Sequence, residues 1–192
     1  MNITKTLRNN IIFFIAIALL LFTPVGTFVK IQLLKIYVAV SSPSSIEEAD
    51  RVVINDFNWK LIDHKGNSVN FQEMEGEIIL VNFWATWCPP CIAEMPNLNE
   101  LHKDYGDKIR FLFIANDDLE KVQAYLTKNN YDLPVYFQKS KAPSTLYSRS
   151  IPATFLIDDR GKIIMKKIGV SDWNSETVRN QIDELIAFSL AE

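Results

Sequence analysis

The chain has 192 residues, of which 48% are hydrophobic and 22% are charged, and its formal net charge at pH 7 is −3. These values are typical of a folded globular protein and exclude an intrinsically disordered chain. The length accommodates one domain with a sizeable core and an additional segment. Acidic residues outnumber basic ones, so the composition gives no indication of nucleic-acid binding.

The first 40 residues predict a membrane segment. Residues 1–10 are polar and contain Lys5 and Arg8, and the uncharged stretch from Ile11 to Val29 that follows is 19 residues long. A helix of that length can cross a hydrocarbon core of roughly 30 Å. The same pattern fits a cleavable secretory signal, but no clear small-residue cleavage site follows it. We therefore expect an uncleaved signal anchor, and both alternatives place the remaining chain outside the cytoplasm.

Residues 41–50 predict a linker. The stretch from Ser41 to Ser45 consists of serines around Pro43, and acidic residues follow it. Such a composition is typical of an extended or flexible connection. We expect it to hold a domain formed by residues 51–192 clear of the membrane.

The remaining chain predicts one α/β domain. Continuous apolar runs at 78–84 and 109–115 indicate strands that are buried on both faces. Turn signals that contain glycine at 63–67 and 159–161 each predict a β-hairpin. The expected elements, in chain order, are a hairpin of 56–61 and 68–71, a strand at 78–84, a helix at 89–105, a strand at 109–115, a helix at 119–129, a short strand at 135–138, an irregular or one-turn helical connection at 139–149, a hairpin of 154–158 and 162–167, and a helix at 175–190.

The only two cysteines lie in the segment Trp84–Cys91, which reads Trp-Ala-Thr-Trp-Cys-Pro-Pro-Cys between a predicted strand and a predicted helix. This position places Cys88 at a helix N-terminus, where the dipole and free N–H groups favour the thiolate. A structural disulfide over so short a loop would add little stability. A zinc site would need two further ligands, for which only His64 and His102 are available. The motif therefore predicts a redox-active disulfide.

In this interpretation Cys88 is the more exposed sulfur and the nucleophile, and Cys91 is the resolving thiol. The two residues between them are prolines, and neither is a histidine that would stabilise the Cys88 thiolate as an imidazolium. This favours a reducing or intermediate couple over a strong oxidant.

Together with the following Glu94-Met95-Pro96, the motif resembles the thioredoxin-like superfamily, and within it the membrane-anchored extracytoplasmic group of TlpA, ResA and the cytochrome c maturation thioredoxins. The resemblance covers residues 50–190. It implies a central mixed β-sheet flanked by helices, with an N-terminal β-hairpin added to the core fold.

The resemblance also implies a thiol–disulfide oxidoreductase without a cofactor or a resident metal. It would reduce partner proteins, with apocytochrome c as a common substrate, and would be re-reduced by an electron-carrying membrane protein. An oxidant or isomerase is the alternative within the same class, and a copper-delivery module is an alternative of another class. A peroxiredoxin-like peroxidase would need a Thr-Pro-x-x-Cys context that the chain lacks.

Four further residues are candidates for the site. The resemblance places Glu94 beneath the sulfurs as a proton relay to Cys91, although a solvated glutamate in a first helical turn is an equally simple interpretation. Ile151 and Pro152 match the superfamily's cis-proline loop, where the backbone of Ile151 would pair with an extended substrate. A trans-proline that begins an edge strand is the alternative. Trp87 is expected at the surface beside Cys88.

The other aromatic and imidazole side chains predict structural roles. Trp84 is expected in the core. His64, in a hairpin turn, and His102, on the helix, are expected to be solvated.

Overall fold

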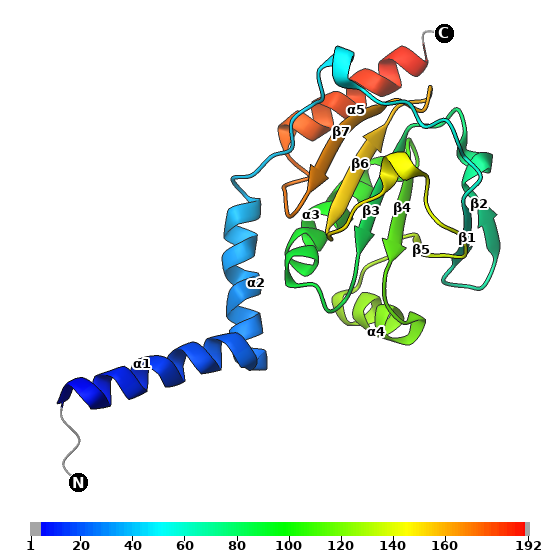
Figure 1. The fold of residues 1–192 in the computed structure, drawn as a ribbon. Coiled ribbons are helices and arrows are strands. Elements are labelled where there is room, and N and C mark those ends of the chain that lie inside the picture. The colour runs from blue at the N-terminus through cyan, green and yellow to red at the C-terminus, as the bar shows by residue number, and fades with distance from the viewer. Residues whose placement is uncertain (1–4, 191–192) are drawn as a thin grey trace.

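The computed structural model describes residues 5–190, which form two N-terminal helices and an α/β domain (Figure 1). The helices are α1 (Lys5–Phe22) and α2 (Pro24–Val38), and they are bent by 74° at the break between them. The hydroxyl oxygen of Thr23 caps α2 by accepting a hydrogen bond from the Gly26 N–H at 3.2 Å. A proline in the first turn of a helix lacks the N–H needed to continue a preceding helix, which explains the break at Pro24.

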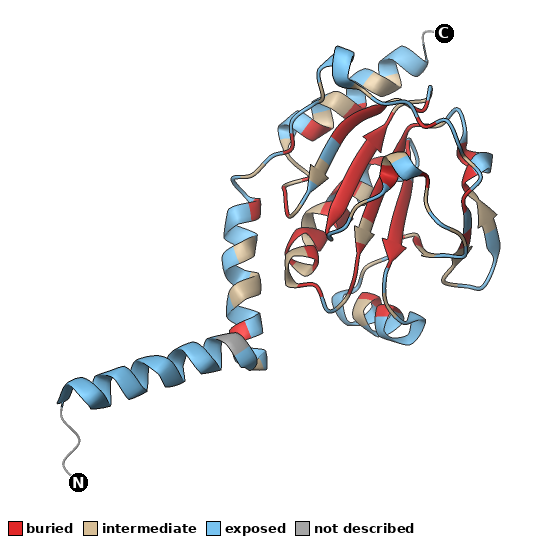
Figure 2. Cartoon of the chain, in the orientation of Figure 1, coloured by how far each residue is buried: buried red, intermediate tan, exposed pale blue. Residues whose placement is uncertain are grey.

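The predicted uncharged stretch is thus divided between two helices. In the described part of the chain no single helix is both long and apolar enough to span a membrane, whereas α1 and α2 meet that criterion as a bent pair. The side chains of residues 5–20 and of Phe22 in α1 are exposed (Figure 2). In contrast, α2 packs against the domain through Leu34 and Val38, which contact Ala93 and Val170.

The predicted linker lies on the domain surface. Ser45 forms an isolated bridge with Met165, and the Ile46 N–H donates to the carbonyl oxygen of Ile164 at 2.8 Å. The segment was expected to act as a spacer between the membrane and the domain, whereas in the structure it pairs with the edge strand of the domain. An edge strand offers backbone hydrogen bonds to any extended segment, and a serine-rich composition does not reveal that the segment uses them.

Within the described residues the domain contains one mixed sheet of seven strands, in the order β2-β1-β5-β4-β3-β6-β7. The strands are β1 (Lys60–Asp63), β2 (Ser68–Asn70), β3 (Ile79–Trp84), β4 (Arg110–Ala115), β5 (Val135–Gln138), β6 (Ala153–Ile157) and β7 (Ile163–Ile168). β3, β4 and β5 are parallel, and the hairpin β1–β2 joins the sheet antiparallel to β5. The mixed sheet and both predicted hairpins are confirmed.

Alternate residues of the central strands face two different cores. On one side Leu80 and Trp84 of β3 pack with helices α3 (Pro89–Tyr105), α4 (Leu119–Asn129) and α5 (Glu176–Ser189). On the other side Ile79 and Val81 pack with the hairpin and with irregular chain that includes Trp59. The sheet is therefore buried on both faces (Figure 2), as continuous apolar strands require. The predicted ranges of α3, α4 and β5 match the structure.

Candidate active site

The disulfide between Cys88 and Cys91 lies where β3 leads into α3, with a Cα–Cα distance of 5.3 Å. Cys88 is the N-cap residue of α3, and its Sγ accepts a hydrogen bond from the Cys91 N–H at 3.3 Å. Pro89 and Pro90 occupy the first helical positions, where a missing N–H costs nothing. In the reduced form, the helix dipole and this N–H donor would favour a thiolate on Cys88, and this role of Cys88 stays a prediction.

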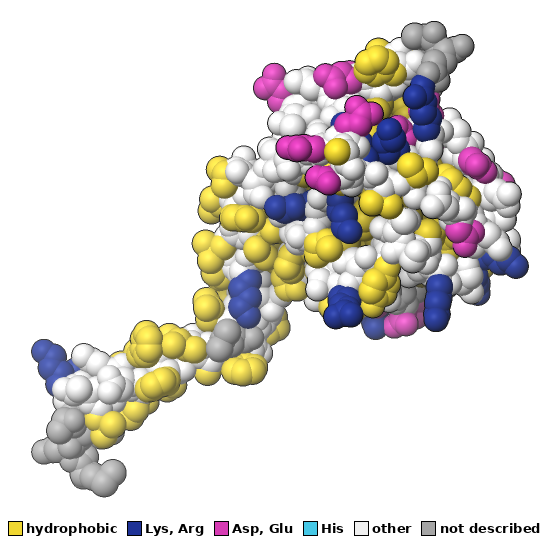
Figure 3. All heavy atoms as spheres, turned by 45° about the horizontal axis from the view of Figure 1, so that its top comes forward, with side chains coloured by type: hydrophobic (Ala, Val, Ile, Leu, Met, Phe, Trp, Pro, Cys, Tyr) yellow, Lys and Arg dark blue, Asp and Glu magenta, His cyan; other side chains and the backbone are white. Residues whose placement is uncertain are grey.

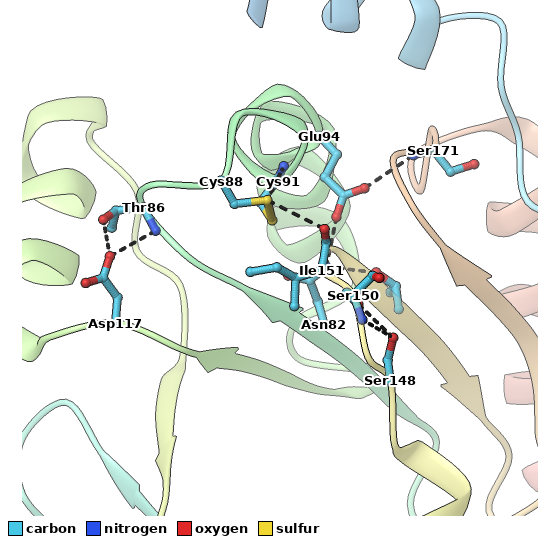
Figure 4. Close-up of a disulfide and its surroundings, with 11 residues drawn as sticks. Asn82, Thr86, Cys88, Cys91, Glu94, Asp117, Ser148, Ser150, Ile151 and Ser171 are labelled. Atoms are coloured by element: carbon cyan, nitrogen blue, oxygen red, sulfur yellow. Dashed lines mark hydrogen bonds between the residues drawn. A yellow bond between two sulfur atoms is a disulfide. The ribbon is translucent and has the colours of Figure 1, made fainter. Parts of the chain in front are cut away.

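The exposure of the two sulfurs differs less than expected. Cys88 is 4% exposed and Cys91 is fully buried, so Cys88 is the more accessible residue but is not an exposed one. The reason is the loop opposite the disulfide, because the carbonyl oxygen of Ile151 lies 3.8 Å from the Cys88 Sγ (Figure 4). This loop therefore lies over the Cys88 sulfur.

The peptide bond between Ile151 and Pro152 is cis, which confirms that structural prediction. The carbonyl oxygen of Pro152 accepts a hydrogen bond from the Gly169 N–H at 2.8 Å, which joins this loop to the end of β7. Trp87 is 62% exposed beside the disulfide, and Trp84 is fully buried, both as predicted. The roles of Trp87, Ile151 and Pro152 in substrate binding stay predictions.

Glu94 is completely buried on α3, one helical turn after Cys91. Its Oε1 accepts a hydrogen bond from Asn82 Nδ2 at 2.9 Å, and its Oε2 accepts one from the Ser171 N–H at 3.3 Å (Figure 4). Burial raises the pKa of Glu94 to about 8, although both donors favour the ionised form and oppose the shift. The solvated glutamate is therefore not what the structure shows. The carboxyl group can hold a proton at neutral pH.

Asn82 is a site residue that the sequence interpretation missed. It lies in β3 and is fully buried, and its Nδ2 also donates to the Thr154 hydroxyl oxygen at 2.8 Å. The sequence does contain a signal for this residue, because Asn82 is the one strongly polar residue in the apolar run 78–84. A buried amide needs partners, so its presence in a central strand indicates a polar group nearby. The backbone donor from Ser171 carries no comparable signal.

A second missed pair fixes the loop before the disulfide. The backbone N–H of Thr86 donates to the carboxylate of Asp117 at 3.3 Å, and the Thr86 hydroxyl donates to the same oxygen (Figure 4). Burial alone would raise the pKa of Asp117, but the hydrogen bonds from Thr86 and Asp118 and the charge of Lys121 hold it below its ordinary value. This carboxylate anchors residues 85–87 at the end of β4.

The histidines have no place in the site. His102 is half-buried, with its ring edge-on to Phe111 at a centroid distance of 5.1 Å, and burial lowers the pKa of its imidazole. This corrects the expectation of a solvated His102, because the aromatic strand β4 lies beneath its helix. His64 is partly buried in the hairpin turn. Among residues 5–190, no three His, Cys, Asp or Glu side chains are grouped so as to hold a metal ion.

The fold and the site define a redox-active Cys-x-x-Cys on a thioredoxin-like domain, and comparison with known proteins agrees. Residues 52–166 match the model of the AhpC/TSA family. The thiol–disulfide oxidoreductase ResA of Bacillus cereus is 33% identical over 58% of this chain and 66% of its own length. ResA of Oceanobacillus iheyensis is 30% identical over 84% of this chain and 83% of its own length. The chain belongs to the AhpC/TSA family, and within it to the thiol–disulfide oxidoreductases that include ResA.

A solved structure is similar over the same domain. The pneumococcal exposed lipoprotein thioredoxin from Streptococcus pneumoniae superposes with a TM-score of 0.55 at 25% identity, over 66% of this chain and 98% of that one.

Proposed function

We propose that this protein reduces disulfides in partner proteins outside the cytoplasm. The observation that carries the proposal is the Cys88–Cys91 disulfide at the start of α3, beside a fully buried Glu94. In the dithiol form the Cys88 thiolate attacks a partner disulfide, which forms a mixed disulfide and releases one partner thiolate. The Cys91 thiolate then attacks Cys88 Sγ, which closes the disulfide and releases the second partner sulfur. Two electrons pass to the partner.

Glu94 supplies the proton transfer that the second step needs. A free thiol has a pKa of about 8.5, close to the value of about 8 to which burial raises the pKa of Glu94. Proton transfer between groups of matched pKa has little thermodynamic cost. Glu94 therefore accepts the proton of Cys91 as that sulfur becomes a nucleophile, and it returns the proton when the disulfide is reduced again.

The partner approaches along the Ile151–Pro152 loop. The carbonyl oxygen of Ile151 already faces Cys88, and an extended segment of a partner can pair with this backbone. The exposed ring of Trp87, the residue before Cys88, supplies an apolar surface near the sulfur. This arrangement selects for an accessible disulfide in an extended chain and not for a particular side chain.

Apocytochrome c fits that description, because its haem-binding cysteines lie in a Cys-x-x-Cys-His segment that must be reduced before haem attachment. The similarity to ResA supports this assignment. The apolar N-terminal helices support attachment to a membrane, where an electron-carrying membrane protein would restore the dithiol. In Figure 3, hydrophobic side chains gather on α1 and α2, whereas most of the charged ones lie on the domain.

The reduction potential of the Cys88–Cys91 couple tests the direction of electron flow. We expect a value near the roughly −270 mV of thioredoxin, measured by tryptophan fluorescence of the full chain in glutathione or dithiothreitol buffers. A value near roughly −120 mV, typical of strong oxidants, would contradict a reductant and favour a disulfide-forming enzyme. The double variant Cys88→Ser/Cys91→Ser is the control, and its fluorescence is expected to be independent of the buffer potential.

A further inference from the structure

The N-terminal segment is tied to the loop that contacts Glu94. The carbonyl oxygen of Ser41, three residues after α2, accepts hydrogen bonds from the Ser171 hydroxyl and from the Asp172 N–H, both at 2.6 Å. α2 itself is seated on α3 through Leu34 and Val38. The segment from α2 to Ser41 therefore meets the domain beside the helix that carries the disulfide.

Ser171 joins this segment to the active-site carboxyl group. The residue is fully buried, its hydroxyl bonds to Ser41, and its N–H donates to Glu94 Oε2 at 3.3 Å. In Figure 4 the N–H of Ser171 is directed toward Glu94, and its side chain projects to the opposite side. A shift of this loop therefore changes a donor to Glu94 and a donor to Ser41 together.

We propose that Ser171 is a positioning residue for Glu94, and that the docked N-terminal segment from α2 to Ser41 holds it in place. Any role of Ser171 in disulfide exchange rests on the proposed function, whereas the effect of Ser171 on the pKa of Glu94 does not. Only two donors contact the Glu94 carboxyl group among the described hydrogen bonds, from Asn82 and from Ser171. Loosening the segment weakens one of the two.

No charged group obscures this effect. The pKa of Glu94 is raised by burial and lowered by Asn82 and Ser171, and no charged side chain is among the causes. Asp172 follows Ser171, but its carboxylate accepts from the side-chain amide of Asn97 at 2.7 Å and from the Asn174 N–H at 2.9 Å. On α3 the two cysteines form the disulfide.

Titration of Glu94 in the oxidised full chain, in detergent micelles, tests the proposal. The probe is the infrared band of its protonated carboxyl group, identified by its loss in Glu94→Gln. Because the Ser171 N–H favours the ionised form, its displacement raises the midpoint. We expect Ser171→Ala to raise it by up to about one pH unit, which lowers the ionised fraction at the wild-type midpoint about fivefold.

Leu34→Ala is the second variant, because it weakens the packing of α2 against the domain without removing a hydrogen bond of the loop that contains Ser171. It is expected to raise the midpoint in the same direction. Ser45→Ala is the matched control: Ser45 lies four residues after Ser41, and the variant removes its 2.6 Å hydrogen bond to Gln181 of α5, which involves neither Ser171 nor Glu94. The midpoint of this control is expected to equal that of the wild type.

The proposal is overturned if Ser171→Ala and Leu34→Ala both titrate at the wild-type midpoint. If Ser171→Ala does not fold, the Leu34→Ala midpoint decides alone, since Leu34 is only partly buried and its truncation is tolerated more easily. The readout needs no substrate and no turnover. A protein that shifts as expected but reduces no disulfides would refute the proposed function and leave the positioning role intact.

Discussion

Glu94 is the only carboxylic or basic residue in the described part of the chain that is fully buried. Two neutral donors replace the water that a carboxylate would otherwise bind, one from the Asn82 side chain and one from the Ser171 backbone. They do not compensate for the loss of solvent, and the pKa of Glu94 rises to about 8. We therefore expect this one side chain to make the stability of the domain depend on pH.

The substitution Glu94→Gln is expected to remove a pH-dependent loss of stability. The folded protein keeps the Glu94 proton up to about pH 8, whereas the unfolded chain releases it at the ordinary pKa of 4.5. Between these values the unfolded state binds fewer protons, so the free energy of unfolding falls as the pH rises. Between pH 5 and pH 8 we expect the wild type to lose roughly 3–4 kcal/mol more than the variant.

Urea denaturation of both oxidised proteins at pH 5, 6.5 and 8 measures this difference. Glu73→Gln is the matched control, since Glu73 is an exposed side chain in the same domain. It is expected to follow the wild type at every pH. Parallel pH profiles for the wild type and Glu94→Gln would show that burial does not raise the pKa of Glu94, so that it would not match the pKa of a thiol as the proposed proton transfer requires.

At the scale of the elements, the loop between β3 and α3 is held by a residue from another strand. Asp117 follows β4, its side chain is only 3% exposed, and both donors of Thr86 converge on it. Hydrogen bonds to a buried charged group contribute about 1.5–3 kcal/mol each at most, and removal of the acceptor leaves the Thr86 N–H without this partner. The position of Cys88 depends on this contact, because Thr86 lies two residues before it.

Asp117→Ala is expected to lower the free energy of unfolding by about 1–2 kcal/mol and to speed the reduction of the disulfide by dithiothreitol. Faster reduction follows because a looser loop opens Cys88 more often. The adjacent Asp118→Ala is the control, since the exposed Asp118 side chain forms only a surface ion pair with Lys121. Equal behaviour of the two variants would show that Asp117 does not anchor the loop.

The elements that local signals determine could be predicted with their ends. Pro89 and Pro90 mark the first turn of α3, and Asn130 in a left-handed conformation ends α4 at the predicted residue. The hairpin β1–β2 was predictable as a hairpin. Its place beside β5 was not, because that pairing joins residues more than 70 positions apart and no local pattern specifies it.

The residues of the candidate site divide in the same way into those that a sequence pattern predicts and those that it does not. The redox pair and the exposed Trp87 could be predicted because a compact motif carries them, and the cis-proline loop because Ile151 and Pro152 match the superfamily's pattern. The environment of Glu94 was left open between burial and exposure, since only tertiary packing decides which side of a helix faces the core. Ser171 could not be predicted, because a backbone N–H contributes no residue type to a pattern.

At the scale of the whole molecule, the N-terminal helices join a strongly apolar segment to a charged domain. α1 exposes large apolar side chains such as Phe13, Phe14 and Leu19, while every acidic residue lies at Glu47 or later. The burial of such a surface in lipid is favourable, because each exposed apolar side chain that moves from water into lipid lowers the free energy. An oxidising compartment outside the cytoplasm would also let the oxidised form of this disulfide couple persist.

These two properties predict that residues 51–192 lie outside the cytoplasm of a bacterial cell. A fusion of alkaline phosphatase after Glu192 tests this, because that enzyme needs disulfides and is active only after export. We expect an active fusion that stays with the membrane fraction after alkaline washing. The control fusion lacks residues 11–22 and is expected to be inactive and soluble, because the remaining segment is too short to enter the bilayer.

The opposite result would place the two cysteines in a different compartment. An inactive fusion of the full chain would place Cys88 and Cys91 in the cytoplasm, where glutathione and thioredoxin keep thiols reduced. There the reduction of apocytochrome c outside the membrane would be impossible for this protein. An active fusion released into the soluble fraction would instead show that the N-terminal segment is cleaved, and that docking of α2 on α3 is absent from the mature protein.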